Sequence, residues 1–315
     1  MANAYTSSTG NLAGTAGGAG LVQKAYDRLL DFALRSEPLI RSVADKRPAK
    51  LANPGSTVVL QLYADLSEQT TALTESTERD SVQIAAPTSV TITLAEYGNS
   101  VLVTRALDLF SLADVDPAIA NIIAFNLAGS IDTVAQTELR GGTNVIYGGT
   151  RTNTVTIAAT DTITSANIRK AVAKLRSGLA VPRKGSMYWC GIHPEISHDL
   201  RAETGAGGWR LPHEYNSNEN IWAGEIGSYE GAYFVESPRM YNATDGASSA
   251  RNYRTILAGQ QALAEAVAEE PHVVIGPVID QLMRFRPMGW YGVLGFKRYR
   301  EEALYRIESG SSIAS

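Results

Sequence analysis

The chain has 315 residues, of which 44% are hydrophobic and 19% charged, a composition inside the ordinary globular range. Its net charge of -4 argues against a dedicated nucleic-acid-binding domain, because such domains gain affinity by neutralising phosphates. The single cysteine, Cys190, excludes an intrachain disulfide, a thiolate zinc cluster and a CxxC redox pair.

Neither a membrane span nor a secretory signal is expected. No run of 18 apolar residues is present, and the N-terminal segment MANAYTSSTG lacks the basic start and the apolar stretch of a signal peptide. We therefore expect a cytoplasmic, soluble product that does not associate with a membrane.

The N-terminal part is predicted to be a loose arm. Residues 1–20 contain five glycines together with alanine, serine and threonine, a composition that buries little surface. Apolar residues then recur at helical spacing from Leu21 to Ser36, and Pro38 marks the expected end of a short amphipathic helix. An arm of this kind becomes ordered most economically by contact with neighbouring copies.

Two strands are expected next, joined by a long connection. Val58, Leu60 and Leu62 alternate with more polar positions, and Val90, Ile92 and Leu94 do the same downstream. The intervening stretch of about two dozen polar and acidic residues is far longer than the usual hairpin loop of about 2 to 5 residues. We interpret it as an extended antiparallel finger.

One long helix and a mixed region follow. Asp116 and Pro117 are a suitable N-cap and first helical residue, and a three-to-four spacing of apolar residues continues until Gly141 and Gly142. The pattern after this helix predicts a short hairpin from Val145 to Ile157 and two helices, from Ser165 to Gly178 and from Pro194 to Glu203. It also predicts an irregular loop at 204–228 with Trp209 and Trp222. Strands are expected at 187–192, 233–235, 255–257, 273–275 and 290–307.

Two oppositely charged runs suggest an assembly contact. From Asp65 to Asp80 there are five acidic residues and one cation, whereas from Lys24 to Lys50 there are seven cations and four acidic residues. Such patches suit a heterologous contact in which the finger of one copy lies over another copy. The candidate interface residues are Asp65, Glu68, Glu75, Glu78 and Asp80 on the finger and Lys24, Arg28, Arg41, Lys46 and Arg47 on the arm. Alternatively, both runs are solvated faces.

No catalytic, cofactor-binding or metal site is predicted. His193 and His198 are five residues apart and do not match the i, i+4 pair of a zinc-binding helix, so a metal reading with Glu195 is disfavoured. Cys190 lies in an apolar strand and is interpreted as a buried core residue. The basic stretch from Arg169 to Lys184 lacks interleaved aromatic residues, which favours a solvated or subunit-contacting face over a nucleic-acid site.

The order of elements, a loose arm, a long finger, one long helix, a mixed α/β region and a returning strand, resembles the HK97-type fold of tailed-bacteriophage major capsid proteins. Several phrases are similar to the family of N4-like major capsid proteins. They are Ser56 to Leu62, Val90 to Gly98 with LAEYG at its end, the helix end LRGG at 139–142, and GWYGVLGFK at 289–297.

This resemblance implies an α+β fold with residues 1–50 as N-arm, 51–105 as E-loop, 106–159 as peripheral domain with a spine helix at 117–140, 160–265 as a mixed α/β axial domain, and 266–315 returning to the peripheral domain. It implies a non-enzymatic major capsid protein of the virion, self-assembling into hexamers and pentamers of an icosahedral shell around double-stranded DNA without sequence-specific binding. Scaffolding, portal and decoration proteins are the implied partners.

Two alternatives stay open from the sequence. One is the shell of an encapsulin-like nanocompartment of the same fold. The other is a metal-dependent hydrolase that uses His193, Glu195 and His198.

Overall fold

The computed structural model describes seven stretches of the chain: residues 39–48, 56–76, 78–79, 81–110, 115–203, 227–278 and 280–313. The helix expected from Leu21 to Ser36 and the loop carrying Trp209 and Trp222 lie outside the described residues.

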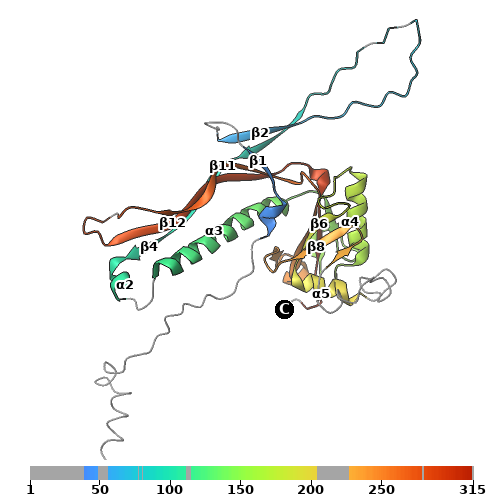
Figure 1. The fold of residues 1–315 in the computed structure, drawn as a ribbon. Helices are drawn as coiled ribbons and strands as arrows, with labels where there is room; N and C mark the ends of the chain where they lie inside the picture. The colour runs from blue at the N-terminus through green and yellow to red at the C-terminus, as the bar shows by residue number, and fades with distance from the viewer. Residues whose placement is uncertain are drawn as a thin grey trace, which may run out of the picture.

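A long four-stranded sheet forms one half of the molecule, with the strand order β1, β11, β12, β4 (Figure 1). Its central strands β11 and β12 are 13 and 14 residues long and antiparallel. β1 pairs with β11 in parallel, and β4 pairs with β12 antiparallel. The bounds are β1 (Asp45–Pro48), β4 (Ala95–Thr104), β11 (Leu263–Ile275) and β12 (Phe285–Arg298).

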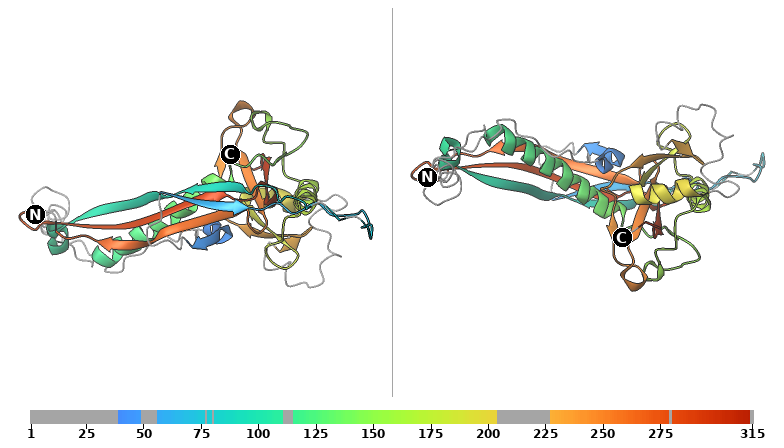
Figure 2. Two further views of the ribbon diagram at one scale, coloured as in Figure 1. Left: turned by 90° about the horizontal axis from the view of Figure 1, so that it is seen from above. Right: turned by 90° about the horizontal axis from the view of Figure 1, so that it is seen from below.

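The helix α3 (Val115–Leu139) runs along one face of this sheet (Figures 1 and 2). Its 25 residues, at about 1.5 Å each, span about 38 Å. Apolar residues at three- and four-residue spacing, such as Ile123 and Leu127, pack against Met288 and Trp290 of β12. The expected long helix is confirmed; it begins at Val115, two residues before Pro117, and the short helix α2 (Arg105–Phe110) precedes it.

A seven-stranded sheet forms the other half. β5, β13, β10, β6, β8 and β7 lie in this order, and β9 pairs with the start of β10. The bounds are β5 (Val145–Tyr147), β6 (Tyr188–Ile192), β7 (Ser228–Tyr229), β8 (Ala232–Glu236), β9 (Asn242–Ala243), β10 (Asn252–Ala258) and β13 (Leu304–Ser309). Short 3-10 turns occur at η1 (Ile40–Val43), η2 (Thr154–Thr156), η3 (Ala247–Ser249) and η4 (Glu301–Ala303).

The helices α4 (Ser165–Ser177) and α5 (Pro194–Ala202) contribute to the core of this second half through Ile168, Leu175 and Ile196. All five residues of β6 are buried, which fits a strand that pairs in parallel with β8 after an α5 crossover. Both helices and β6 were expected. The N-cap of α4 is Thr164, and the carboxylate of Glu203 accepts hydrogen bonds from the Ser165 backbone N–H and hydroxyl.

One expectation for strand pairing differs from the structure. The predicted hairpin at 145–157 is wrong, because β5 pairs in parallel with β13 and residues 154–156 form the turn η2. The partner of β5 lies far away in the sequence. The segment 266–315 contains β12 of the long sheet and also β13, which pairs with β10 in the seven-stranded sheet.

The expected finger is present at its base. β2 (Thr57–Leu62) and β3 (Thr88–Thr93) form a separate two-stranded antiparallel sheet with Leu60 opposite Val90. Between them, the described residues of 63–87 are extended without regular secondary structure and project away from both halves (Figure 1). We call residues 63–87 the finger shaft.

Candidate assembly surfaces

The base of the finger is fixed on the long sheet. Ile92 of β3 is fully buried against Ala264 and Ala266 of β11, with Val58 and Leu60 packed around them. Small residues are needed under the hairpin, because a Cβ on Gly295 of β12 would collide with the carbonyl oxygen of Thr93. The finger therefore leaves the molecule in a defined direction.

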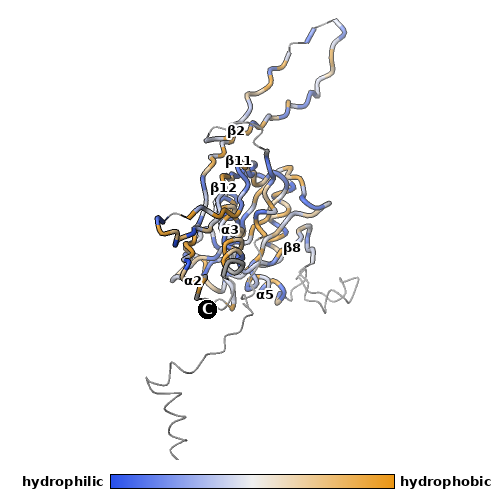
Figure 3. Tube along the Cα trace, turned by 60° about the vertical axis from the view of Figure 1, so that its left-hand side comes forward, coloured by the Kyte–Doolittle hydropathy of each residue, from blue (hydrophilic) through white to orange (hydrophobic). Residues whose placement is uncertain are grey.

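The finger shaft exposes large apolar side chains. Tyr63 is 68% exposed and Leu73 is 73% exposed. Figure 3 shows apolar and polar residues interspersed along the whole shaft. Its other exposed large apolar residues are Leu66, Val82 and Ile84. A contiguous limb with this much uncovered apolar surface indicates an interaction surface.

The acidic residues predicted for the interface lie on this shaft. Asp65, Glu68, Glu75 and Glu78 are exposed and form no ion pair with any described residue, whereas Asp80 lies outside the described residues. The side-chain hydrogen bonds of the shaft are local: Gln69 donates to the Thr71 carbonyl at 3.1 Å, and Arg79 donates to Gln69. The described acidic residues of the shaft are therefore not neutralised by an ion pair within the described chain.

The described cations of the arm have partners within the chain. Arg41 donates from Nε to Glu265 at 2.8 Å and pairs through Nη2 with Glu270 at 3.0 Å. Lys46 lies 3.5 Å from Glu270, and the guanidinium of Arg47 lies 5.4 Å from the ring centroid of Tyr299. Lys24 and Arg28 lie outside the described residues. The acidic residues of β11 were not predicted as partners of the arm, although the sequence AEAVAEE at 264–270 contains them.

A buried carboxylate joins the arm to α3. Asp132 is 2% exposed and accepts the backbone N–H groups of Ile40 at 2.6 Å and Arg41 at 3.1 Å. Burial raises the pKa of Asp132 from its ordinary value, against the opposing effect of these hydrogen bonds and of the Arg239 guanidinium 3.7 Å away.

The arm also joins the two halves of the molecule. Asp45 pairs with Arg183 at 3.1 Å, and its other oxygen accepts the backbone N–H of Gln261 at 2.6 Å. Arg183 precedes β6 of the seven-stranded sheet, while β1 belongs to the long sheet. Residues 40–48 therefore act as a strap across the junction.

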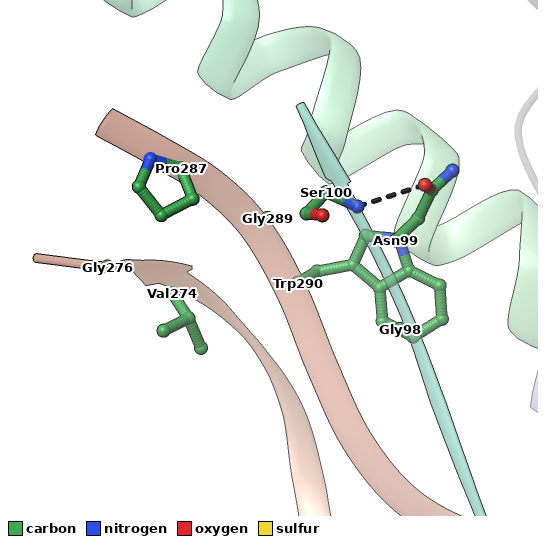
Figure 4. A pocket seen from close by; sticks show the side chains of 8 residues that line it. All are labelled: Gly98, Asn99, Ser100, Val274, Gly276, Pro287, Gly289 and Trp290. Atoms are coloured by element: carbon green, nitrogen blue, oxygen red, sulfur yellow. Dashed lines mark hydrogen bonds between the residues drawn. The ribbon is translucent and has the colours of Figure 1, made fainter. Parts of the chain in front are cut away.

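A groove of about 370 Å³ lies across β4, the first half of β12 and the end of β11 (Figure 4). Gly98, Gly289 and Gly276 leave it without side chains, and Val274 and Pro287 form its apolar rim. Trp290 directs its ring to α3, where Nε1–H donates to Asn126 at 2.9 Å. None of its lining residues is ionisable, and Asn99 and Ser100 are the lining residues with polar side chains besides Trp290.

The residues weighed for a metal site have structural roles. The His193 ring accepts the backbone N–H of Glu195 at the N-terminus of α5, and the carboxylate of Glu195 accepts a hydrogen bond from the Tyr253 hydroxyl. Asp199, beside His198, accepts the Ser312 backbone N–H at 2.9 Å. Burial lowers the pKa of His193. Within the described ranges, no cluster of three His, Cys, Asp or Glu residues is placed to hold a metal ion.

Cys190 is fully buried in β6, as expected for a core residue, and burial raises its pKa. The thiol is therefore held in its neutral form. Among the described helices, none combines the length and the hydropathy that a bilayer crossing requires.

The basic stretch forms an exposed face of α4. Arg169, Lys170 and Lys174 are exposed, while Ile168, Val172 and Leu175 face the core. Farther along, Arg183 pairs with Asp45, and Lys184 lies over the Tyr233 ring at 5.8 Å. In the described part of the chain, Arg183 therefore has an acidic partner, whereas Arg169, Lys170, Lys174 and Lys184 form no ion pair.

The chain matches the model of one protein family. A family model described as phage capsid protein matches residues 43–311, which is most of the chain. No curated protein matches the sequence.

Solved structures give the same fold. The capsid of Ralstonia phage GP4 is 17% identical, with a TM-score of 0.73 over 92% of this chain and 95% of that chain. The capsid of cyanophage Pam1 is 14% identical, with a TM-score of 0.74 over 93% and 98%. The capsid of Helicobacter pylori bacteriophage KHP30 is 15% identical, with a TM-score of 0.73 over 94% and 97%. The chain therefore has the HK97-type fold, an α+β architecture.

Proposed function

This chain belongs to the phage capsid protein family, and from that premise we propose how its surfaces build a shell. It is a major capsid protein, a structural subunit of the virion capsid that assembles with copies of itself. We propose that the finger of each copy lies across a neighbouring copy within hexamers and pentamers of an icosahedral shell around double-stranded DNA.

The observation that carries this proposal is the finger shaft. Each limb has about 12 residues and reaches about 40 Å at about 3.3 Å per residue. The side chains of Tyr63, Leu66 and Leu73 are more than half exposed there, and the described acidic residues have no ion pair within the described chain. A limb of this length cannot bury its apolar residues on itself, so a sister copy is the economical cover.

The finer divisions follow from the same proposal. The long sheet with α3 would be the peripheral domain, and the seven-stranded sheet would be the axial domain. Scaffolding, portal and decoration proteins are the expected partners, and assembly is expected in the host cytoplasm. The closer affiliation with N4-like capsid proteins stays a prediction.

The proposal assigns this chain no catalytic activity and no cofactor. His193, Glu195 and His198 take part in separate contacts around α5, which supports a structural role for each. The family match favours a phage capsid over the alternative of a nanocompartment shell. A nanocompartment would give small cages that enclose a protein cargo, whereas the capsid proposal gives DNA-filled heads.

Shortening the finger tests the proposal. Residues 66–84 are replaced by a short Gly-Ser turn, which leaves β2 and β3 paired. We expect the chain to remain folded but to form no shells, as followed by negative-stain microscopy and sedimentation after expression with the other head proteins.

The control variant replaces residues 186–187 of the Lys184–Met187 turn with Gly-Ser, because that turn is local. It should assemble as the native chain does. Normal shells from the shortened-finger variant would contradict the proposal, as would a native chain that stays monomeric in every condition in which the head proteins are present.

A further inference from the structure

We propose that the basic face of α4, formed by Arg169, Lys170 and Lys174, is the surface of one copy that receives the acidic finger shaft of a second copy. This inference rests on the proposed function and adds the receiving surface to it. From the charge pattern of the sequence alone, the arm is the expected receiving surface.

The face is continuous and strongly basic. Lys170 and Lys174 are four residues apart, so their side chains are neighbours on the helix surface, and Arg169 lies about 100° around the helix from Lys170 on the same exposed side. The helix SANIRKAVAKLRS contains no acidic residue. Nearby, Glu203 is bound to Ser165, while Glu230 and Glu302 are exposed and form no ion pair with α4. The three cations therefore form a positive patch that makes no ion pair within the described chain.

The arm is a weaker candidate for this role. Arg41 and Lys46 already bind Glu265 and Glu270, and Arg47 stacks on Tyr299. To receive the finger, Arg41 would have to leave Glu265, which is fully buried, and an uncompensated buried carboxylate is costly. The cations of α4 are available without breaking any such pair.

The finger matches the α4 face in polarity as well as in charge. Its acidic residues alternate with apolar ones, as in Asp65 with Leu66 and Leu73 with Glu75. At the C-terminal end of α4, Leu179 is 81% exposed and Val181 is 50% exposed, so the patch also offers an apolar edge. Ionic contacts set the register of such an interface, and apolar burial contributes most of the affinity.

The two surfaces lie at the same end of the molecule. In Figures 1 and 2, the finger and α4 both project at the end opposite α2. A cyclic ring whose axis passes near that end brings the finger of one copy over α4 of the next. The contact is heterologous, so it can repeat around a closed ring.

A charge swap tests the inference. One variant carries Glu68→Lys, Glu75→Lys and Glu78→Lys, a second carries Arg169→Glu, Lys170→Glu and Lys174→Glu, and a third carries all six changes. We expect shell yield to fall about tenfold or more in each triple variant and to recover in the sixfold variant, because complementary charge is restored. The matched control, Arg169→Lys with Lys170→Arg and Lys174→Arg, should assemble normally. Circular dichroism checks that α4 is retained.

Each outcome of the charge swap supports or contradicts α4 as the receiving surface. If the finger variant fails and the six changes give no recovery, α4 is not the receiving surface, while the proposed role of the finger stands. If the α4 variant forms normal shells that package less DNA, the patch meets nucleic acid and the inference is wrong. If both triple variants assemble normally, the ionic contact does not exist.

Discussion

Asp132 shows how a single side chain positions the arm. Its carboxylate is nearly inaccessible to solvent, and it is the acceptor for the first N–H groups of η1. The orphan N–H groups of a helix start require acceptors, and a carboxylate is a strong one. The arm thus begins its path over the sheet from a fixed point on the spine helix.

Replacing this carboxylate should loosen the arm. We expect Asp132→Ala to lower the free energy of unfolding by about 2 kcal/mol, because two hydrogen bonds to a charged acceptor are lost and Arg239 loses its partner. The measurement is urea unfolding of the unassembled, finger-shortened chain. Thr137→Ala on the same helix is the control, since its exposed hydroxyl bonds only to the Thr133 carbonyl, and it should change stability by much less.

The decrease in the free energy of unfolding caused by Asp132→Ala should depend on pH in one direction. The pKa of Asp132 is raised by burial, so the folded chain holds the proton more tightly than the unfolded chain. The contribution of Asp132 is fully present below the pKa of the unfolded side chain, about 3.9, and diminishes as the pH rises through the folded value. The loss caused by Asp132→Ala should therefore be greater at pH 4.5 than at pH 7.5. An equal or smaller loss at pH 4.5 would contradict this account.

At the scale of elements, the finger depends on the small residues beneath it. β3 crosses the long sheet where Ala264, Ala266 and Gly295 leave room for Ile92. Protein interiors are close-packed, so a larger residue there has to displace the hairpin. The direction of the finger is thus determined by residues outside the finger.

We expect Gly295→Val to disrupt shell assembly while the seven-stranded sheet stays folded, because the new side chain displaces β3. Shell yield by sedimentation and the near-ultraviolet circular dichroism of the unassembled chain are the measurements. Gly227→Ala is the matched control, since no atom lies within 4 Å of the added Cβ. Native yield from Gly295→Val would show that the hairpin position does not matter.

Local patterns predicted the elements that depend on local sequence. Three patterns predict the element that forms there: the apolar spacing of α3 and α4, the alternation of β2 and β3, and the apolar run of β6. The pairing of β1 with β11 and of β5 with β13 could not be predicted, because the partners are more than 150 residues apart. For the same reason, Glu265 and Glu270 were not recognised as partners of Arg41.

At the scale of the whole molecule, each half exposes one surface that could contact another copy. The core of each half is buried within the chain, whereas the finger shaft and the α4 face are exposed, and we propose that other copies cover them. Two complementary surfaces at one end of the chain form a heterologous contact, and such contacts close into rings when the rotation between copies allows it. In the proposed shell, this repeated contact holds the copies of each hexamer or pentamer together.

Hydrogen–deuterium exchange of residues 63–87, compared between the unassembled chain and the intact shell, tests this account most directly. The account predicts fast exchange and no protection in the unassembled chain, and clear protection in the shell, centred on the acidic stretch from Asp65 to Glu78. Equal exchange in the two states would contradict it, because the finger would then gain nothing from its sister copies.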